Sequence, residues 1–145
     1  NVDKELKLIP DGVFDVSIIS HTIQVLKHPD RMMQQLLRVA KWALVAFPNF
    51  GYIGMRFSLL FTGRMPNTRQ FPYEWYDTPN IHNCTVTDFF DFCKQFRLKA
   101  NILHCHSSSI LGKILLALGC PNLGADRVIM RLTEDHDAVK EMNHE

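Results

Sequence analysis

The chain has 145 residues, 46% of them hydrophobic, which is typical of one domain with a buried core. Its 16 basic and 15 acidic side chains leave a formal net charge of +1, which excludes a strong field for nucleic acid or for an anionic membrane. No apolar run approaches the roughly 18 residues that span a bilayer, and the four cysteines form no CxxC pair, so we expect a cytoplasmic protein with reduced thiols.

The first part of the chain predicts a strand, a helix and a second strand. The turn Pro10-Asp11-Gly12 leads into Phe14–Ser20, an apolar run typical of a parallel strand covered on both faces. A helix is predicted over Arg31–Val39, with Pro29 near its start, followed by a buried strand over Trp42–Phe47. Elements in this order predict a βαβ unit with parallel strands.

The stretch from Phe47 to Cys84 is far longer than the usual connection of about 4–6 residues, and such long connections are usually functional or disordered. It holds four of the seven prolines and three of the seven glycines. Disorder is not expected, because disordered segments are poor in aromatic residues. We therefore interpret residues 47–84 as an ordered insertion or lid over the mouth of a site. Its expected anchors are the aromatic residues Phe71, Tyr73, Trp75 and Tyr76.

The remainder alternates between helical and strand patterns and ends in a polar tail over residues 133–145. We expect the last two strands to form an antiparallel edge of the sheet. In chain order, the expected elements are a helix over Val86–Phe96 capped by Thr85 or Thr87, a strand over Leu98–Cys105, a short helix over Ile110–Leu118, a loop over Gly119–Gly124 and a strand over Arg127–Leu132.

Several motifs carry a resemblance to a known family. FDVSIISHTIQVLKHPDRMMQQLLRV resembles the segment after the cofactor-binding half of a class I S-adenosylmethionine (SAM) methyltransferase. VAFPNFG, LLFTGRMPNT, PYEWYDTPNIHNCTVTDF and PNLGADRVIMRL resemble the methionine biosynthesis protein MetW family, from Asn1 to about Leu132. The resemblance implies a Rossmann-like α/β methyltransferase fold with a mostly parallel sheet and an antiparallel edge. It also implies a role in methionine synthesis beside a homoserine O-acyltransferase.

The chain departs from the family pattern at its start. It contains no GxGxG loop, which the family pattern places upstream of Asn1, together with the acid that grips the cofactor ribose. Residues 1–132 are thus expected to be the C-terminal part of a methyltransferase-like domain, incomplete at its N-terminus by natural truncation or as a fragment. SAM is expected as the cofactor of a longer protein, whereas this chain alone should bind it weakly or not at all.

Ser20, His21 and Gln24 follow the carboxyl end of the first strand, where open α/β sheets place their ligands. Given the resemblance, we interpret them as the edge of a cofactor site; the alternative is a polar loop with local hydrogen bonds. His104 and His106 lie on one face of an extended chain, but no other residue completes a ligand set with metal spacing. We expect no metal site.

The insertion supplies most of the other candidates. Its aromatic and hydrogen-bonding side chains, held between Pro72 and Pro79, suit a ligand pocket or a partner surface. The alternative for the aromatic side chains is a lid that packs on its own core. The alternative for Arg56 and Arg64 is that they are surface residues that only solubilise an amphipathic helix. The predicted partner or ligand surface comprises Asn49, Arg56, Arg64, Tyr73, Glu74, Trp75, Tyr76, Asp77, Asn80 and His82. The candidates for a catalytic role are Tyr73, Tyr76 and His82.

Two functions follow. The first is a methyltransferase-like accessory protein that acts with homoserine O-acyltransferase in methionine biosynthesis, with no nucleic acid or membrane as a partner. The alternative is a SAM-dependent small-molecule methyltransferase. In either case the methyltransferase order implies a strand beside Phe14–Ser20 that this chain lacks. We therefore expect self-association through this open strand edge, unless residues 1–10 fold back over it.

Overall fold

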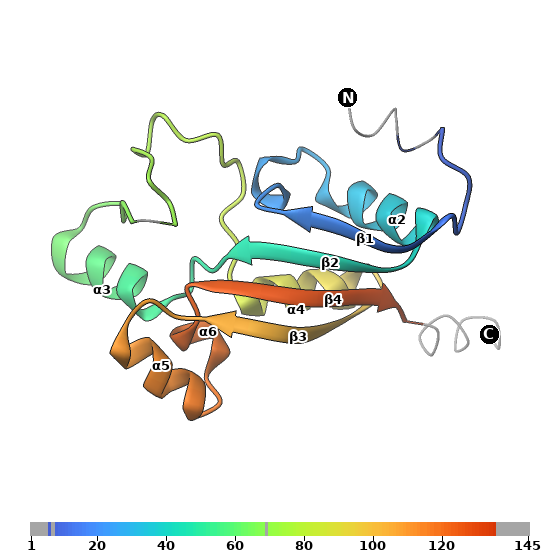
Figure 1. Cartoon of the computed structure of the whole chain (residues 1–145). Coiled ribbons are helices and arrows are strands. Elements are labelled where there is room, and N and C mark those ends of the chain that lie inside the picture. Colours follow the sequence, from blue (N-terminus) through green and yellow to red (C-terminus); the bar gives the residue numbers. More distant parts are fainter. Residues whose placement is uncertain (1–5, 7, 69, 136–145) are drawn as a thin grey trace.

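The computed structural model describes residues 6, 8–68 and 70–135, which form a four-stranded sheet with helices around it (Figure 1). The strands are β1 (Phe14–Ser20), β2 (Ala40–Pro48), β3 (Leu98–His106) and β4 (Arg127–Glu134), in the spatial order β1-β2-β4-β3. β1 and β2 are parallel, which confirms the predicted βαβ unit. β4 runs antiparallel to both neighbours, so the predicted antiparallel edge pair of the last two strands is also confirmed. The fold is mixed α/β.

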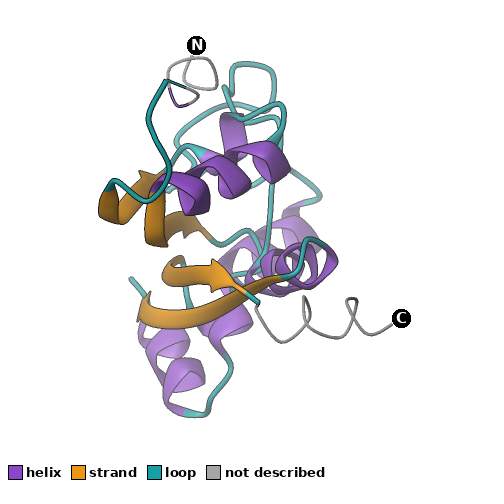
Figure 2. Cartoon of the chain, turned by 90° about the vertical axis from the view of Figure 1, so that its right-hand side faces the viewer, coloured by secondary structure: helices purple, strands orange, loops and turns teal. Residues whose placement is uncertain are grey.

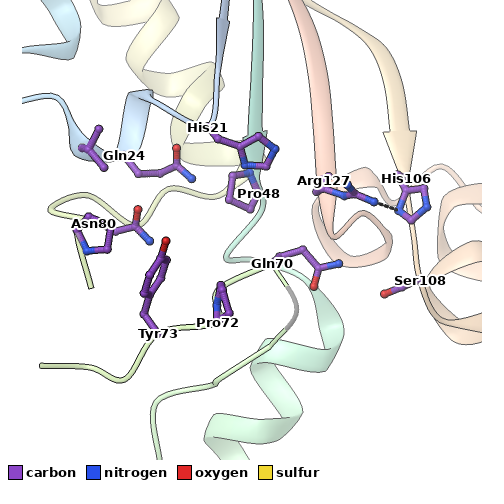
Figure 3. Close-up of a pocket in the computed structure, with 12 residues that line it drawn as sticks. His21, Gln24, Pro48, Gln70, Pro72, Tyr73, Asn80, His106, Ser108 and Arg127 are labelled. Atoms are coloured by element: carbon purple, nitrogen blue, oxygen red, sulfur yellow. Dashed lines mark hydrogen bonds between the residues drawn. The ribbon is translucent and has the colours of Figure 1, made fainter. Parts of the chain in front are cut away.

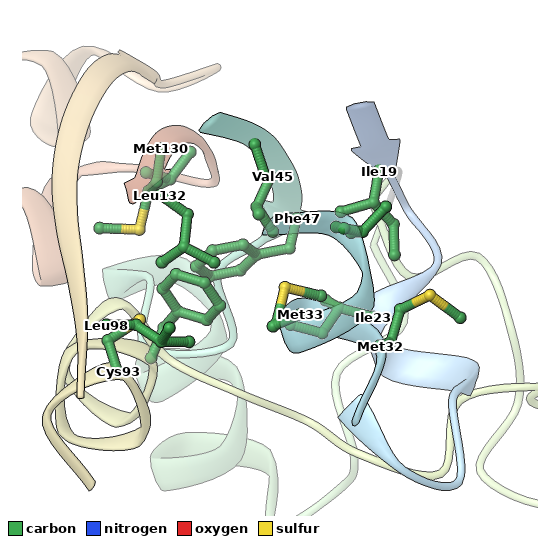
Figure 4. Packing of buried hydrophobic residues seen from close by; sticks show 14 of the residues in the cluster. Ile19, Ile23, Met32, Met33, Val45, Phe47, Cys93, Leu98, Met130 and Leu132 are labelled. Atoms are coloured by element: carbon green, nitrogen blue, oxygen red, sulfur yellow. The ribbon is translucent and has the colours of Figure 1, made fainter. Parts of the chain in front are cut away.

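Helices α2 (Pro29–Val39) and α4 (Val86–Gln95) cover the same face of the sheet (Figure 2). α4 begins with the predicted cap, in which the Thr85 hydroxyl accepts from the Asp88 N–H and the Asp88 carboxylate accepts from the Thr85 N–H. The core lies between these helices and the strands (Figure 4). Among its residues are Ile19, Met33, Leu36, Val45, Phe47, Phe89, Cys93, Val128, Met130 and Leu132.

The prediction that β1 is covered on both faces was wrong for the described residues. On one face Ile19 is buried and the Ser17 hydroxyl donates to the Leu36 carbonyl of α2. On the other face Phe14 and Ile18 remain 46% and 68% exposed, because both described helices of the core pack on the opposite side. Among the described residues β1 has one strand neighbour, β2, and self-association through its other edge stays a prediction.

The connection after β2 contains a helix of its own, α3 (Ile53–Thr62), which ends at Gly63 in the left-handed conformation (φ 62°). The expected loop over Gly119–Gly124 contains a short helix instead, α6 (Pro121–Gly124), because Pro121 starts a turn that the Gly124 N–H closes onto the Cys120 carbonyl. α5 (Ile110–Ala117) lies where a short helix was predicted.

β4 extends two residues beyond its predicted end, and residues 136–145 of the predicted tail lie outside the described residues. None of the helices in the described ranges combines the length and the apolar character that crossing a bilayer requires.

The insertion is anchored by one ring of its aromatic block. Phe71 is 6% exposed and packs edge-on against Phe50, with ring centroids 5.3 Å apart. Trp75 and Tyr76 contact each other but are 73% and 72% exposed. The expectation that the whole aromatic block anchors the segment was therefore wrong, and so was the alternative of a lid packed on these rings. The exposed rings are available for contacts outside the described chain.

Candidate functional site

The carboxyl ends of β1, β2 and β3 and the start of β4 lie together at one end of the strands (Figure 1). A pocket of about 460 Å³ opens at this end of the strands, and its volume is within the range of small-molecule sites (Figure 3). One wall comes from the residues that follow β1, the second from the returning half of the insertion, and the third from the ends of β3 and β4. The lining residues are His21, Gln24, Val25, Pro48, Gln70, Pro72, Tyr73, Pro79, Asn80, His106, Ser108 and Arg127.

Gln24 joins two of these walls. It lies in the short helix η1 (Ile23–Val25), and its backbone carbonyl accepts from the N–H groups of Ile81 and His82 at 2.9 and 3.0 Å. These bonds tie the returning half of the insertion to the end of β1. The side chain is 3% exposed, and its Oε1 has no hydrogen-bond partner among the described residues. A buried unpaired acceptor is costly, so the Gln24 amide is a polar group that the described fold leaves unsatisfied beside the pocket.

Replacement of Gln24 by leucine is expected to leave the free energy of unfolding unchanged or to raise it by about 1 kcal/mol. The change removes an unpaired buried acceptor and leaves the backbone bonds to the insertion in place. Urea unfolding measures the effect, with Gln34→Leu on the exposed face of α2 as the matched control. A loss of 1 kcal/mol or more relative to that control would show that the Gln24 amide has a structural role.

His21 has the second unusual feature of the site. Its backbone φ is 52°, in the left-handed region that a residue with a side chain rarely adopts, and its N–H donates to the Ala46 carbonyl at 2.9 Å. Such conformations cost about 1–3 kcal/mol and gather at functional sites. The turn lifts the chain out of the sheet and places the His21 imidazole on the pocket wall.

A histidine–carboxylate pair forms the wall at β3 and β4. The His106 Nδ1 lies 3.0 Å from the Asp126 Oδ1, and the backbone N–H of Ser108 donates to the Asp126 Oδ2 at 2.6 Å. Asp126 is 2% exposed, and its own N–H donates to the His106 carbonyl. A carboxylate on Nδ1 orients the imidazole and leaves its Nε2 for a ligand or a proton. Arg127 adds a cation beside the pair, 3.4 Å from the His106 Nδ1 (Figure 3).

The environment of Asp126 favours its ionised form. Burial is the largest influence and by itself raises the pKa of this carboxyl. The hydrogen bonds from Ser108 and His106, together with the nearby charge of His106, outweigh burial, so that the pKa lies below its ordinary value. The group contributes stability above the ordinary pKa, and this stability is lost as the pH falls through the lowered one. Asp126 is therefore a carboxylate at neutral pH.

The structure distributes the predicted site residues over three places. His21 and Gln24 line the pocket with Tyr73 and Asn80 from the insertion. Ser20 lines a smaller neighbouring pocket of about 280 Å³ together with His21 and His106. His82 lines a separate apolar pocket of about 230 Å³, which Gln24 also lines. Of the three catalytic candidates, only Tyr73 lines the main pocket.

The other residues of the predicted surface lie apart from the pocket. Asn49 is not a surface residue, because it is fully buried and bonded to backbone groups on three sides. Those that lie on the outside and do not line the main pocket are Arg56, Arg64, Glu74, Trp75, Tyr76 and Asp77.

Gln70, Ser108, Asp126 and Arg127 are pocket or supporting residues that sequence reasoning missed. The available signal was polar residues at strand ends: the sequence HCHSSS closes β3, and Asp126 immediately precedes β4. In the sequence, His106 was considered only as a metal ligand, and no metal site was expected. No group of three or more His, Cys, Asp or Glu side chains in the described ranges is arranged to hold a metal ion.

The described cysteines are free thiols. Burial, with a smaller contribution from the charge of Asp88, raises the pKa of Cys84 to about 12. Burial likewise raises the pKa of Cys93 to about 12. Thiols with such pKa values are protonated at neutral pH, so Cys84 and Cys93 act as small hydrophobic residues and are not nucleophiles.

The pocket fits only one side of a SAM site. Its buried Gln24 acceptor and its place at the carboxyl ends of parallel strands suit a ligand of this kind. Close backbone approach to SAM needs glycines, yet none of the seven glycines lines the pocket. Gly51, Gly112 and Gly124 pack instead against other parts of the chain, where an added Cβ would meet atoms within 3 Å. The described pocket residues therefore lack the glycines that close backbone approach to SAM needs.

Comparisons with known proteins agree with this fold. Residues 1–132 match the model of the family described as "Methionine biosynthesis protein MetW". Over 89 residues the chain is 32% identical to the bifunctional methionine biosynthesis protein MetXA/MetW of Rhodopirellula baltica, covering 61% of this chain and 14% of that protein.

Solved SAM-dependent methyltransferases have a similar fold. One, from Thermotoga maritima, described as a possible histamine N-methyltransferase, has a TM-score of 0.52 at 15% identity and covers 87% of this chain and 58% of its own. Another, from Archaeoglobus fulgidus, has a TM-score of 0.55 at 11% identity, and the matched region covers 92% of this chain and 65% of that protein. The chain thus spans less than two thirds of the length of each of these three proteins.

The strand order, the site at the carboxyl ends of the strands and the family match over residues 1–132 lead to one conclusion. The chain has a class I SAM methyltransferase-like fold and belongs to the MetW family of methionine biosynthesis proteins.

Proposed function

We propose that this chain is an accessory protein of methionine biosynthesis that associates with a homoserine O-acyltransferase. The observation that carries the proposal is the relative in which the MetW part shares one polypeptide with a MetXA part. Joining two modules keeps them at a high effective concentration, which favours a contact between them. In organisms where the two parts are separate chains, the same contact has to form between two proteins.

The exposed side chains of the chain are consistent with a protein partner. Trp75 and Tyr76 stand in the solvent in an edge-to-face contact, with ring centroids 5.5 Å apart. Large aromatic side chains of this kind are the residues most often found at the energetic centre of interfaces. Tyr73 and Asn80, from the same segment, face the pocket, so this segment links the outer surface to the site.

The test uses the homoserine O-acyltransferase encoded in the same genome. Gel filtration with light scattering is expected to show a complex of the two proteins at micromolar concentrations. Acyl transfer to homoserine, measured with and without the chain, is expected to be faster in the complex. Separate elution at every concentration, together with an unchanged rate, would contradict the proposal.

A SAM-dependent small-molecule methyltransferase is the second candidate, favoured by the unpaired Gln24 acceptor and the oriented His106 in one pocket. When bound, SAM would supply an electrophilic methyl group. His106, oriented by Asp126, would then hold the proton of an acceptor at its Nε2. Isothermal calorimetry with SAM tests this candidate: tight, stoichiometric binding that Gln24→Leu abolishes would favour it over the accessory role.

A further inference from the structure

Helix α3 departs from the usual pattern of a surface helix. Phe57, Leu59, Leu60 and Phe61 are 44%, 47%, 72% and 78% exposed, and they lie on several sides of its last two turns. A helix that is apolar all round is normally buried. Figure 1 shows the reason for the exposure, because α3 extends away from the end of the sheet.

The start of α3 is held firmly in the fold. Met55 is 3% exposed, and the Tyr52 hydroxyl, just before the helix, forms a 2.5 Å hydrogen bond with the Ser109 hydroxyl. The Arg56 Nε donates to the Gly51 carbonyl at 2.7 Å. At the other end, Gly63 closes the helix with a bond to the Leu59 carbonyl. α3 is thus a formed helix with a fixed root, and its apolar end needs no folding step before it binds.

One face of this end has the spacing of a docking helix. Phe57, Leu60 and Phe61 stand at positions i, i+3 and i+4, and the centroids of the two phenylalanine rings are 5.7 Å apart. Arg64 lies just beyond the end of the helix, after Gly63. Helices that bind in apolar grooves use anchors at this spacing. Exposed apolar side chains lie on several sides of the end of α3, so a groove that surrounds the helix would cover them better than a flat surface.

The charge around the helix restricts what can cover it. From Pro48 to Tyr73 the sequence contains no aspartate or glutamate, and its ionisable residues include Arg56 and Arg64. A two-fold contact between copies of this chain would place these cations against their own equivalents, which is unfavourable. A membrane surface suits a helix with one polar and one apolar face, and α3 does not have that division. An apolar groove with an acidic rim on another protein satisfies both the shape and the charge.

We propose that α3 is the docking helix for the homoserine O-acyltransferase, inserting Phe57, Leu60 and Phe61 into an apolar groove whose rim carries acidic side chains. This inference rests on the proposed function and adds the contact surface and the chemistry of the groove. The fusion relative places a MetXA part on the same polypeptide as the MetW part, which makes that protein the expected owner of the groove.

The experiment measures the dissociation constant between the whole chain and the acyltransferase for the wild type and four variants. Leu60→Ala/Phe61→Ala is expected to weaken binding by about 30-fold or more, as truncation of hot-spot anchors does. Ile114→Ala/Leu118→Ala is the matched control, because these side chains, on α5 and at its C-cap, are also apolar and are 52% and 71% exposed. Arg64→Glu is expected to weaken binding, whereas Lys113→Glu on α5 should not. Unchanged thermal melts show that each variant folds.

The outcomes separate the two proposals. If the wild type binds the acyltransferase and the α3 variants bind equally well, the docking helix is refuted and the accessory role stands. If the wild type does not bind at all, both proposals fall. The docking helix is also refuted if the α3 variants lose only self-association in light scattering, or only binding to anionic phosphatidylserine vesicles, while their affinity for the acyltransferase is unchanged.

Discussion

Replacement of Asn49 by alanine is expected to lower the free energy of unfolding by about 3–6 kcal/mol. The Asn49 Nδ2 donates to the carbonyls of Asn122 and Ala125, each at 2.8 Å. Its Oδ1 accepts from the N–H groups of Gly51 at 3.0 Å and Val86 at 3.1 Å. One buried side chain thus joins the end of β2 to the starts of α3 and α4 and to the turn before β4.

Alanine would leave most of these buried backbone groups unpaired, because only the Val86 N–H has a second acceptor, the Asn122 Oδ1. Since small domains are stable by only about 5–15 kcal/mol, this loss would remove a large share of the total stability. Chemical denaturation followed by circular dichroism measures the loss. Asn101→Ala, at an exposed position of β3, is the control and should change stability by no more than about 0.5 kcal/mol. Equal stability of the two variants would show that Asn49 is not the junction described here.

Replacement of Phe89 by alanine is expected to cost about 3–5 kcal/mol, the usual range for a buried phenylalanine. The Phe89 side chain is 2% exposed and lies between α4 and the sheet. Its ring centroid is 4.9 Å from that of Phe47 on β2 and 6.0 Å from that of Phe92 on α4. The cavity left by alanine would remove the contact that fixes α4 against β2 and, with it, the position of the insertion's return.

The next residue provides the control. Phe90 has the same side chain on the same helix but is 37% exposed, so Phe90→Ala should cost about 1 kcal/mol or less. Thermal unfolding of the two variants side by side gives the difference directly. A loss for Phe90→Ala as large as that for Phe89→Ala would mean that α4 packs through a different face from the one described.

The candidate site was only partly visible in the sequence. His21 and Gln24 were found because ligands of open α/β sheets bind where parallel strands end, and the strand ending at Ser20 is a clear apolar run. The pairing of His106 with Asp126 was not found, since these residues are 20 positions apart, His106 at the end of β3 and Asp126 just before β4. The unpaired state of the Gln24 oxygen depends on every atom around it, so no local pattern predicts it.

Asn49 shows the same limit in the opposite direction. Beside Pro48 at the start of a long loop, an asparagine reads as a surface residue with an amide free to bind. In the fold, the Asn49 side-chain amide donates hydrogen bonds to the carbonyls of Asn122 and Ala125, more than seventy residues further along the chain. The exposure of Trp75 was likewise unpredictable, because the sequence does not say which ring of an aromatic block finds a partner. Phe71 did so because Phe50 lies beside it.

The sequence by itself determined the family and most of the elements, but not helices α3 and α6. The local signals act over only a few residues: apolar runs, helical spacing, the Thr85–Asp88 cap and Pro29. For this reason the bounds of β1 (Phe14–Ser20) were predicted without error and those of α4 within one residue. Only the tertiary structure decided that β4 enters between β2 and β3, which face of β1 is covered, and that α3 points into solvent. These features depend on contacts between distant segments, and such contacts form only when the whole sheet is assembled.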